Sequence, residues 1–395
     1  MAGVARNGNG APRPLSISGG EILSGDGLRS RNLRLEGGRV VALNETPELG
    51  DRIFDASGLL VLPGIVDLHG DAFERQIMPR PKVRFAHDLA LMDTDRQLIA
   101  NGITTAYHGL TLSWEPGLRS LRAGREFVAA LRANRRHLAC DTRLHIRWET
   151  FALDAVDEVR DWLEAEPDPV LAFNDHTTQS YIGRTSTDKL NEWAGRAGIT
   201  AEEYAAMLEE VWSRAAEVEP AKARLAEVAT AAGAAMLSHD DMTPDMRRAY
   251  RALGCHVAEF PLSLETASDA RDAGEHIVLG APNVVRGGSH NNALNAADAI
   301  TAGLCTILAS DYYYPALVQA VFRLVRERGL NLADAWPLVS RNPALAAGLD
   351  DRGELSPGQR GDAILVRAQA HAPAQVVATI VAGQLVHLTE DRLAA

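Results

Sequence analysis

Cysteine and lysine are scarce in this chain of 395 residues. The three cysteines, Cys140, Cys255 and Cys305, lie far apart and form no CxxC pair. This spacing argues against a disulfide scaffold and against a zinc site built from thiolates. Lysine occurs only at positions 82, 189 and 222, so nearly all basic residues are arginines.

Long hydrophobic runs and an excess of positive charge are also absent. No segment approaches the ~18 consecutive apolar residues of a membrane span, and residues 1–14 lack the apolar core of a signal peptide. The 52 acidic residues outnumber the 40 basic ones, which gives a net charge of −12. Because binding to nucleic acid or anionic membranes needs positive charge, we expect neither partner. We expect a cytoplasmic protein that acts on a small molecule.

Strand-like segments at both ends of the chain predict a small domain. Short β-rich runs, broken by glycine turns, fill residues 15–62 and return in residues 355–395. We therefore expect one composite β-sandwich domain built from these two segments. Residues 1–14 are predicted to be a disordered tail.

The middle of the chain, residues 63–354, has a different pattern. Short apolar strands alternate with long helical stretches about eight times, and the longest helical stretch is 187–231. Repeated βα units of this kind predict an α/β fold, a closed (β/α)8 barrel of the TIM type. A doubly wound sheet is the alternative, but no GxGxxG follows the first strand.

Polar residues stand at the carboxyl ends of the predicted strands, where such barrels carry their sites. These residues are His69 and Asp71, His108, His145 and Glu149, Asp175 and His176, His239, Asp240 and Asp241, and Asp311. A single histidine at such a place is more often a core or loop residue than a ligand. A succession of strands that end in histidine and carboxylate is not expected from packing alone. Imidazole and carboxylate together suit zinc, manganese or iron.

Eight segments carry a resemblance to a known family. They are PGIVDLHGD (63–71), HGDAFERQIMPRP (69–81), RLHIRWE (143–149), FNDH (173–176), LSHDDMT (237–243), AEFP (258–261), GAPNVVRGGSH (280–290) and SDYYYP (310–315). The first resembles the first-strand signature of the amidohydrolase superfamily, which usually reads HxH. Together they resemble the branch of diphosphatases that act on a ribose 5-triphosphate in the carbon–phosphorus lyase pathway.

This resemblance implies a hydrolase with two divalent metal ions, zinc first and manganese or iron as alternatives. The implied ligands are His69 and Asp71 on the first strand, Glu149 where the superfamily has a fourth-strand carboxylated lysine, His176 on the fifth strand, His239 on the sixth and Asp311 on the eighth. None of the three lysines stands at a predicted strand end, which supports Glu149 as the bridging ligand. The implied reaction is attack by a hydroxide that bridges the metals, with Asp311 as the catalytic group that takes the proton of the attacking water.

The implied substrate is alpha-D-ribose 1-methylphosphonate 5-triphosphate or a similar ribosyl triphosphate, cleaved to the 5-phosphate and diphosphate in phosphonate catabolism. The residues expected to bind this phosphorylated small molecule are Arg80, Lys82, Arg286, His108 and His290. Arg286 precedes two glycines, which allow close approach to an anion. A solvated loop is the alternative for Arg80 and Lys82. We also expect a homo-oligomer, a dimer.

Two segments, 70–79 and 105–119, depart from the pattern of the characterised diphosphatases, and both are expected at the mouth of the pocket. Cleavage of a C–N bond in a cyclic amide or a related small molecule is therefore an alternative function. A catalytically inactive barrel that acts as a binding scaffold is the second alternative. The fold by itself does not choose among these.

Overall fold

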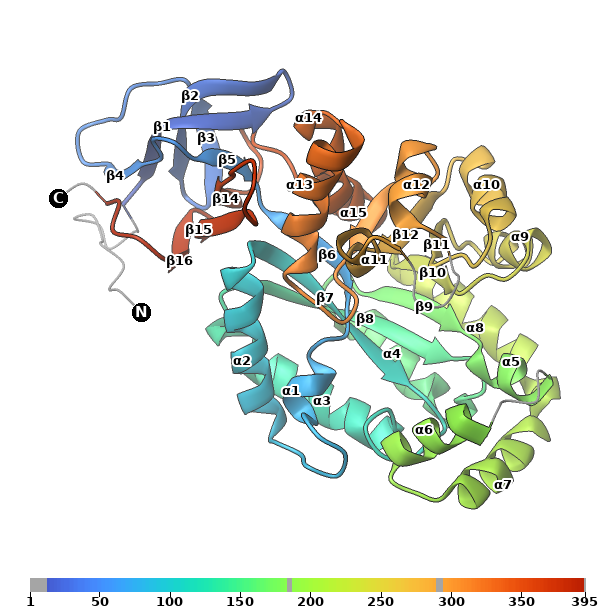
Figure 1. Cartoon of the computed structure of the whole chain (residues 1–395). Helices are drawn as coiled ribbons and strands as arrows, with labels where there is room; N and C mark the ends of the chain where they lie inside the picture. Colours follow the sequence, from blue (N-terminus) through green and yellow to red (C-terminus); the bar gives the residue numbers. More distant parts are fainter. Residues whose placement is uncertain (1–12, 183–186, 289–293, 394–395) are drawn as a thin grey trace.

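The structure, a computed structural model, describes residues 13–182, 187–288 and 294–393. Most of the tail predicted for residues 1–14 lies outside these ranges. The described chain contains two eight-stranded sheets, one in a small β-domain and one in a barrel (Figure 1). The predicted fold class is thereby confirmed. None of the described helices is long and apolar enough to cross a membrane.

The β-domain combines strands from both ends of the chain, drawn in blue and red in Figure 1. Its strands are β1 (Leu15–Ser24), β2 (Gly27–Glu36), β3 (Arg39–Leu43), β4 (Arg52–Asp55), β5 (Leu60–Pro63), β14 (Ala363–Arg367), β15 (Gln375–Val381) and β16 (Gln384–Leu388). They form one hydrogen-bonded sheet in the order β16-β15-β14-β5-β1-β2-β3, with β4 paired to β1. The two chain ends meet where β5 pairs with β14 in the antiparallel sense.

The barrel follows directly after β5. Its strands are β6 (Ile65–Gly70), β7 (Ile103–Leu112), β8 (Asp141–Glu149), β9 (Val170–Asn174), β10 (Ala235–His239), β11 (Val257–Glu259), β12 (His276–Gly280) and β13 (Ile307–Ala309). Neighbouring strands are parallel throughout. The sheet closes where Gly70 bridges Asp311, because the Asp311 amide donates to the His69 carbonyl at 2.9 Å.

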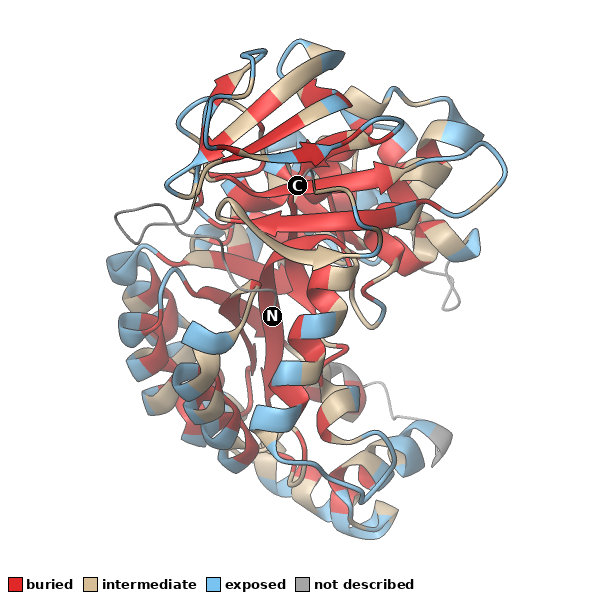
Figure 2. Cartoon of the chain, turned by 90° about the vertical axis from the view of Figure 1, so that its left-hand side faces the viewer, coloured by how far each residue is buried: buried red, intermediate tan, exposed pale blue. Residues whose placement is uncertain are grey.

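Helices surround the barrel and bury the outer faces of its strands, while side chains of the strands themselves fill the interior. The α-helices are α1 (Glu74–Ile77), α2 (His87–Ala100), α3 (Leu121–Asn134), α4 (Val156–Ala165), α5 (His176–Ile182), α6 (Thr187–Ala197), α7 (Ala201–Trp212), α8 (Val218–Ala232), α9 (Pro244–Ala252), α10 (Leu264–Asp272), α11 (Ala281–Arg286), α12 (Ala296–Thr301), α13 (Ala316–Arg328), α14 (Leu332–Ala335) and α15 (Arg341–Ala346). The 3-10 turns are η1 (Arg135–His137), η2 (Leu153–Ala155), η3 (Ala215–Glu217) and η4 (Trp336–Val339). Figure 2 shows buried strands inside and helices whose outer faces are exposed. Every residue of β6 and β7 is buried, as expected for parallel strands that are covered on both faces.

The helical stretch predicted over 187–231 is divided into α6, α7, η3 and α8. The break after α6 falls at Gly198, whose positive φ of 80° suits glycine. A new helix then starts at a capping box in which Thr200 and Glu203 satisfy each other's backbone amides. As a result α6 and α7 leave the barrel wall and stand over the strand ends.

Candidate metal centre and active site

The carboxyl ends of the barrel strands bring most of the predicted ligands together. Potential ligand atoms lie within 4.8 Å of one another in three sets: His69, His239 and Glu259; His176, His239 and Asp240; and His69, Asp71 and Asp311. His69 and His239 each belong to two sets, so the three sets form one continuous cluster of nitrogen and oxygen donors.

The barrel strands that the resemblance implied for three of the ligands were wrong. Glu149 ends β8, the third barrel strand, whereas the fourth strand was expected. His176 follows the fourth strand and His239 ends the fifth, each one strand earlier than expected. Asp311 follows β13, the eighth strand, as expected.

Strand alternation explains which side chains of β8 enter the site. His145, Arg147 and Glu149 are two residues apart and share the face toward the barrel interior. Between them Ile146 and Trp148 face outward and are buried in the hydrophobic layer under the helices. One strand therefore supplies Glu149, which was predicted as a ligand, and His145, which was listed among the strand-end residues without a specific role. It also supplies Arg147, which sequence reasoning did not consider.

Glu259 is a further residue that sequence reasoning missed. Its carboxylate is fully buried at the end of β11 and accepts a hydrogen bond from His69 Nδ1 at 2.7 Å. Its second oxygen, Oε2, lies 3.8 Å from His145 Nε2 and 3.9 Å from His239 Nε2. The available signal was its place in the AEFP segment, at the end of a short apolar strand.

Burial lowers the basicity of the rings around Glu259. It lowers the pKa of His145 to about 3 and brings the pKa of His69 well below its usual range. Both rings are therefore neutral near pH 7, which leaves a nitrogen lone pair free to bind a metal. His145 Nδ1 is committed to the Leu68 carbonyl at 2.9 Å, so its unpaired nitrogen is Nε2.

Glu149 belongs to none of the three sets found among the described residues, but it contacts His176, which does. His176 Nδ1 donates to Glu149 Oε1 at 2.6 Å, and His176 Nε2 lies 3.2 Å from Asp240 Oδ2. The negative charge of Glu149 raises the pKa of His176 to about 10. Burial acts to raise the pKa of Glu149, but the His176 ring outweighs it and lowers that pKa to about 2.

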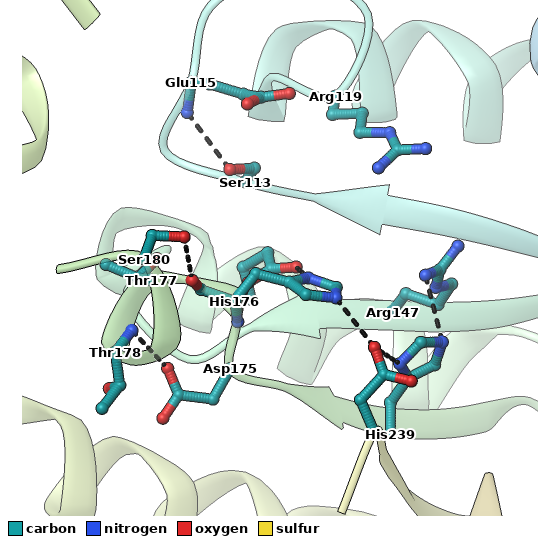
Figure 3. Close-up of polar contacts among 12 residues, drawn as sticks. Ser113, Glu115, Arg119, Arg147, Asp175, His176, Thr177, Thr178, Ser180 and His239 are labelled. Carbon is teal, nitrogen blue, oxygen red and sulfur yellow. Dashed lines mark hydrogen bonds and ion pairs between the residues drawn. The ribbon is translucent and has the colours of Figure 1, made fainter. Parts of the chain in front are cut away.

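Arg147 places a positive charge inside the donor cluster. Its Nη1 donates to Asp71 Oδ2 at 3.3 Å, and its Nη2 donates to His239 Nε2 at 3.2 Å. Figure 3 shows this guanidinium facing the His239 ring, which comes from the second strand along the sheet. The arginine therefore contacts one ligand candidate from the first strand and one from the fifth.

The turn after β13 fixes Asp311 opposite Asp71. Asp311 has a φ of 55°, a left-handed conformation that costs energy in a non-glycine residue and is often found at functional sites. Burial and the neighbouring Asp71 raise the pKa of Asp311 to about 7. Next to it, the Ser310 amide donates to buried Asp67 Oδ1 at 3.0 Å, which anchors the turn.

The predicted substrate contacts are more scattered than the ligands. Arg80 and Lys82 are exposed on the loop after α1. Arg286 is exposed at the end of α11, and its Nη1 lies 3.5 Å from the Tyr312 hydroxyl, next to Asp311. His108 is not brought to the cluster, because the alternation of β7 turns its ring outward between Phe73 and Phe127. His290 lies outside the described residues.

The residues present fit metal ions. Buried polar atoms without a hydrogen-bond partner include Glu259 Oε2, which belongs to the cluster, and His145 Nε2, which lies 3.8 Å from it. Burying such atoms without a partner is costly. Neutral imidazoles beside several carboxylates are the donors that zinc, manganese and iron accept.

Solved structures share this architecture. The N-isopropylammelide isopropylaminohydrolase of Burkholderia multivorans gives a TM-score of 0.63 at 18% identity, over 95% of this chain and 98% of that one. The β-aspartyl dipeptidase of Fervidobacterium islandicum gives 0.62 at 16% identity, over 95% and 97%. These similarities concern the fold. This chain therefore has the class of fold that these amidohydrolase structures share, with a donor cluster at its strand ends.

A sequence relative narrows this class. The alpha-D-ribose 1-methylphosphonate 5-triphosphate diphosphatase of Escherichia coli K12 is 30% identical over 354 residues, which cover 87% of this chain and 91% of the relative. No protein-family model matches the chain. The chain belongs to the amidohydrolase superfamily, in the family of this diphosphatase, and it is a hydrolase. The alternative of an inactive scaffold is therefore not supported.

Proposed function

We propose that this hydrolase cleaves the phosphoanhydride of alpha-D-ribose 1-methylphosphonate 5-triphosphate or a similar ribosyl triphosphate. The products would be the 5-phosphate and diphosphate, as a step of phosphonate catabolism. The observation that carries the proposal is the similarity to the Escherichia coli diphosphatase named for this substrate, over 91% of the length of that enzyme. Cytoplasmic location and a homodimeric assembly stay predictions from the sequence.

Two divalent ions, zinc first with manganese or iron as alternatives, are proposed for the donor cluster. His69, Asp71 and Asp311 would hold one ion, and His176 and His239 the other. Glu149, on the strand next to the one that His176 follows, would be the bridging carboxylate. Bound dications would lower the pKa of the attacking water and stabilise charge on the phosphoryl oxygens. Glu259 would orient His69 through the 2.7 Å hydrogen bond, as carboxylates next to metal-binding histidines commonly do.

Three residues of the chain would transfer the proton, compensate charge and contact the substrate. The carboxylate of Asp311, next to Asp71, is placed to accept a proton from the attacking water and to return it to the leaving diphosphate. Arg147 compensates the negative charge of Asp71 and keeps the carboxylates of the centre from repelling each other. Arg286, beside Tyr312, is the candidate that would contact phosphate oxygens.

A release assay tests this function. Protein loaded with zinc, manganese or iron is incubated with ribosyl and nucleoside triphosphates, and diphosphate and phosphate are measured separately. Diphosphate release from a ribosyl triphosphate, lost with chelator and restored with metal, is expected. Elemental analysis should find about two metals per chain. Hydrolysis of dihydropyrimidines or hydantoins with no release from triphosphates would instead support cleavage of a C–N bond.

A further inference from the structure

A cavity of about 130 Å³ lies directly beside Glu149 and His176. Its walls come from the end of β7 with the loop that follows, from the first turn of α5, and from α6 and α7. Figure 3 shows Ser113, Glu115 and Arg119 on that loop, across from the α5 residues Thr177 and Ser180. The loop belongs to segment 105–119, one of the two segments that depart from the family pattern.

The charges in this wall are already compensated. Arg196 Nε and Nη2 each donate to the buried carboxylate of Glu115 at 2.9 Å, and the Tyr204 hydroxyl donates to the same carboxylate at 3.0 Å. Arg119 is held in the same bidentate way by Glu74, at 3.0 and 2.9 Å. A polyphosphate needs cations that are not already paired, so these two arginines do not make a polyphosphate site.

What the cavity offers instead is aromatic surface and hydroxyl groups. The rings of Trp114 and Trp193 lie 5.0 and 6.1 Å from the Tyr204 ring. Trp114 is fixed because its Nε1 donates to Thr177 Oγ1 at 2.9 Å. The hydroxyl of Thr111 also lines the cavity; it is buried and has no hydrogen-bond partner. A buried hydroxyl without a partner is ready to bond a polar ligand group.

The cavity and Arg286 lie on different sides of the barrel mouth, so the site has two separate parts on either side of the donor cluster. The cavity adjoins β8, the third barrel strand, whereas Arg286 follows β12, the seventh. Strands four positions apart in an eight-stranded barrel lie on opposite sides. The metal donors lie between the two.

We propose that this cavity binds the sugar ring of the substrate, with its hydroxyls on Thr111 and its carbon face against the aromatic rings. The inference rests on the proposed function and adds the orientation of the substrate. The sugar lies toward α6 and α7, and the phosphate chain crosses the donor cluster toward Arg286. Segment 105–119 and the helices α6 and α7 thus select an organic triphosphate over inorganic triphosphate.

The test compares two threonine variants on two substrates. Thr111→Val removes the unpaired hydroxyl in the cavity and preserves its shape. Thr142→Val, the matched control, removes another buried and unpaired hydroxyl at the beginning of β8, at the opposite end of the barrel. For each protein, kcat/KM is measured with D-ribose 5-triphosphate and with inorganic triphosphate, and their ratio is the preference for the sugar.

Loss of one neutral hydrogen bond should reduce this preference about 3–10-fold in Thr111→Val and leave it unchanged in Thr142→Val. Trp193→Ala, checked for folding by circular dichroism, should reduce the preference further. An unchanged preference in Thr111→Val, or an equal decrease in Thr142→Val, overturns the inference.

A binding measurement separates this inference from the proposed function. If the wild type cleaves neither triphosphate, the proposed function fails, and calorimetric titration with D-ribose 5-phosphate then decides about the cavity. A sugar site is supported if the wild type binds D-ribose 5-phosphate and Thr111→Val binds it at least threefold more weakly than Thr142→Val does. No binding to the wild type, or equal binding to both variants, overturns it.

Discussion

Replacing Arg147 by methionine tests whether its guanidinium balances the charge of the donor cluster. The side chain is only 6% exposed and lies 3.3 Å from Asp71 Oδ2. At that distance Coulomb's law gives about 5 kcal/mol for an effective dielectric constant of about 20. Removing one partner of a buried ion pair costs about 3–5 kcal/mol. We expect R147M to lose about this much stability when the protein is stripped of metal.

Bound metal should reduce that loss. Two ions, one held with Asp71 and the other with His239, would supply positive charge at the place where the variant lacks it. Arg147 also donates to His239 Nε2 at 3.2 Å and so competes for a ligand atom. We therefore expect R147M to bind Zn²⁺ at least tenfold more tightly than the wild type, which corresponds to about 1.4 kcal/mol of added stabilisation by metal. Thermal unfolding with chelator and with zinc, together with a competition titration for zinc, measures both quantities.

Arg352→Met is the matched control for this experiment. The Arg352 side chain is 4% exposed, and its Nη1 lies 2.6 Å from the carboxylate of Asp141, the first residue of β8. This pair is buried like that of Arg147 but lies at the other end of the same strand. Its loss of stability should be the same with and without metal. Equal losses for R147M under the two conditions would refute the reasoning.

Three further predictions concern the site. Glu149→Gln keeps the size of the side chain but removes its negative charge. We expect elemental analysis to show the loss of one metal, and we expect a rate at least about a hundredfold lower. Normal metal content and rate would mean that another residue bridges the metals. Glu259→Gln weakens the 2.7 Å contact to His69, so metal affinity should fall about 10–100-fold, and an unchanged zinc titration would contradict this. Arg286→Ala should cost about 1.5–3 kcal/mol in kcat/KM for a ribosyl triphosphate at unchanged metal content, as expected for a hydrogen bond to a charged group; full activity would remove Arg286 from the phosphate site.

The donor cluster shows how far the sequence predicts a site. His69, Asp71, His176, His239 and Asp311 all lie in the three sets of neighbouring donor atoms. These five residues could be predicted because the carboxyl ends of all parallel strands lie at the same end of a barrel. Polar residues at those strand ends therefore lie near one another.

Sequence reasoning missed or misplaced residues whose role depends on which face of a strand their side chain occupies. Arg147 lies two residues before Glu149 and so shares its face, but an arginine within an apolar strand gave no signal of a metal centre. His108 was expected at a strand end, but β7 continues to Leu112, and the ring packs against Phe73 and Phe127 on the helix side. A shift of one residue along a strand reverses the face, and the sequence does not specify that register.

The sequence by itself determined the elements of this protein: eight strand–helix units, strand-rich ends, and histidines and carboxylates at the strand ends. Those features follow from local periodicity, which each segment carries alone. Only the tertiary structure decided that β5 pairs with β14 across some 300 residues of chain, that Glu259 and Arg147 join the donors, and that α6 and α7 enclose a cavity beside Glu149. Such contacts join residues far apart in the chain, so they depend on barrel closure and on the face each side chain occupies.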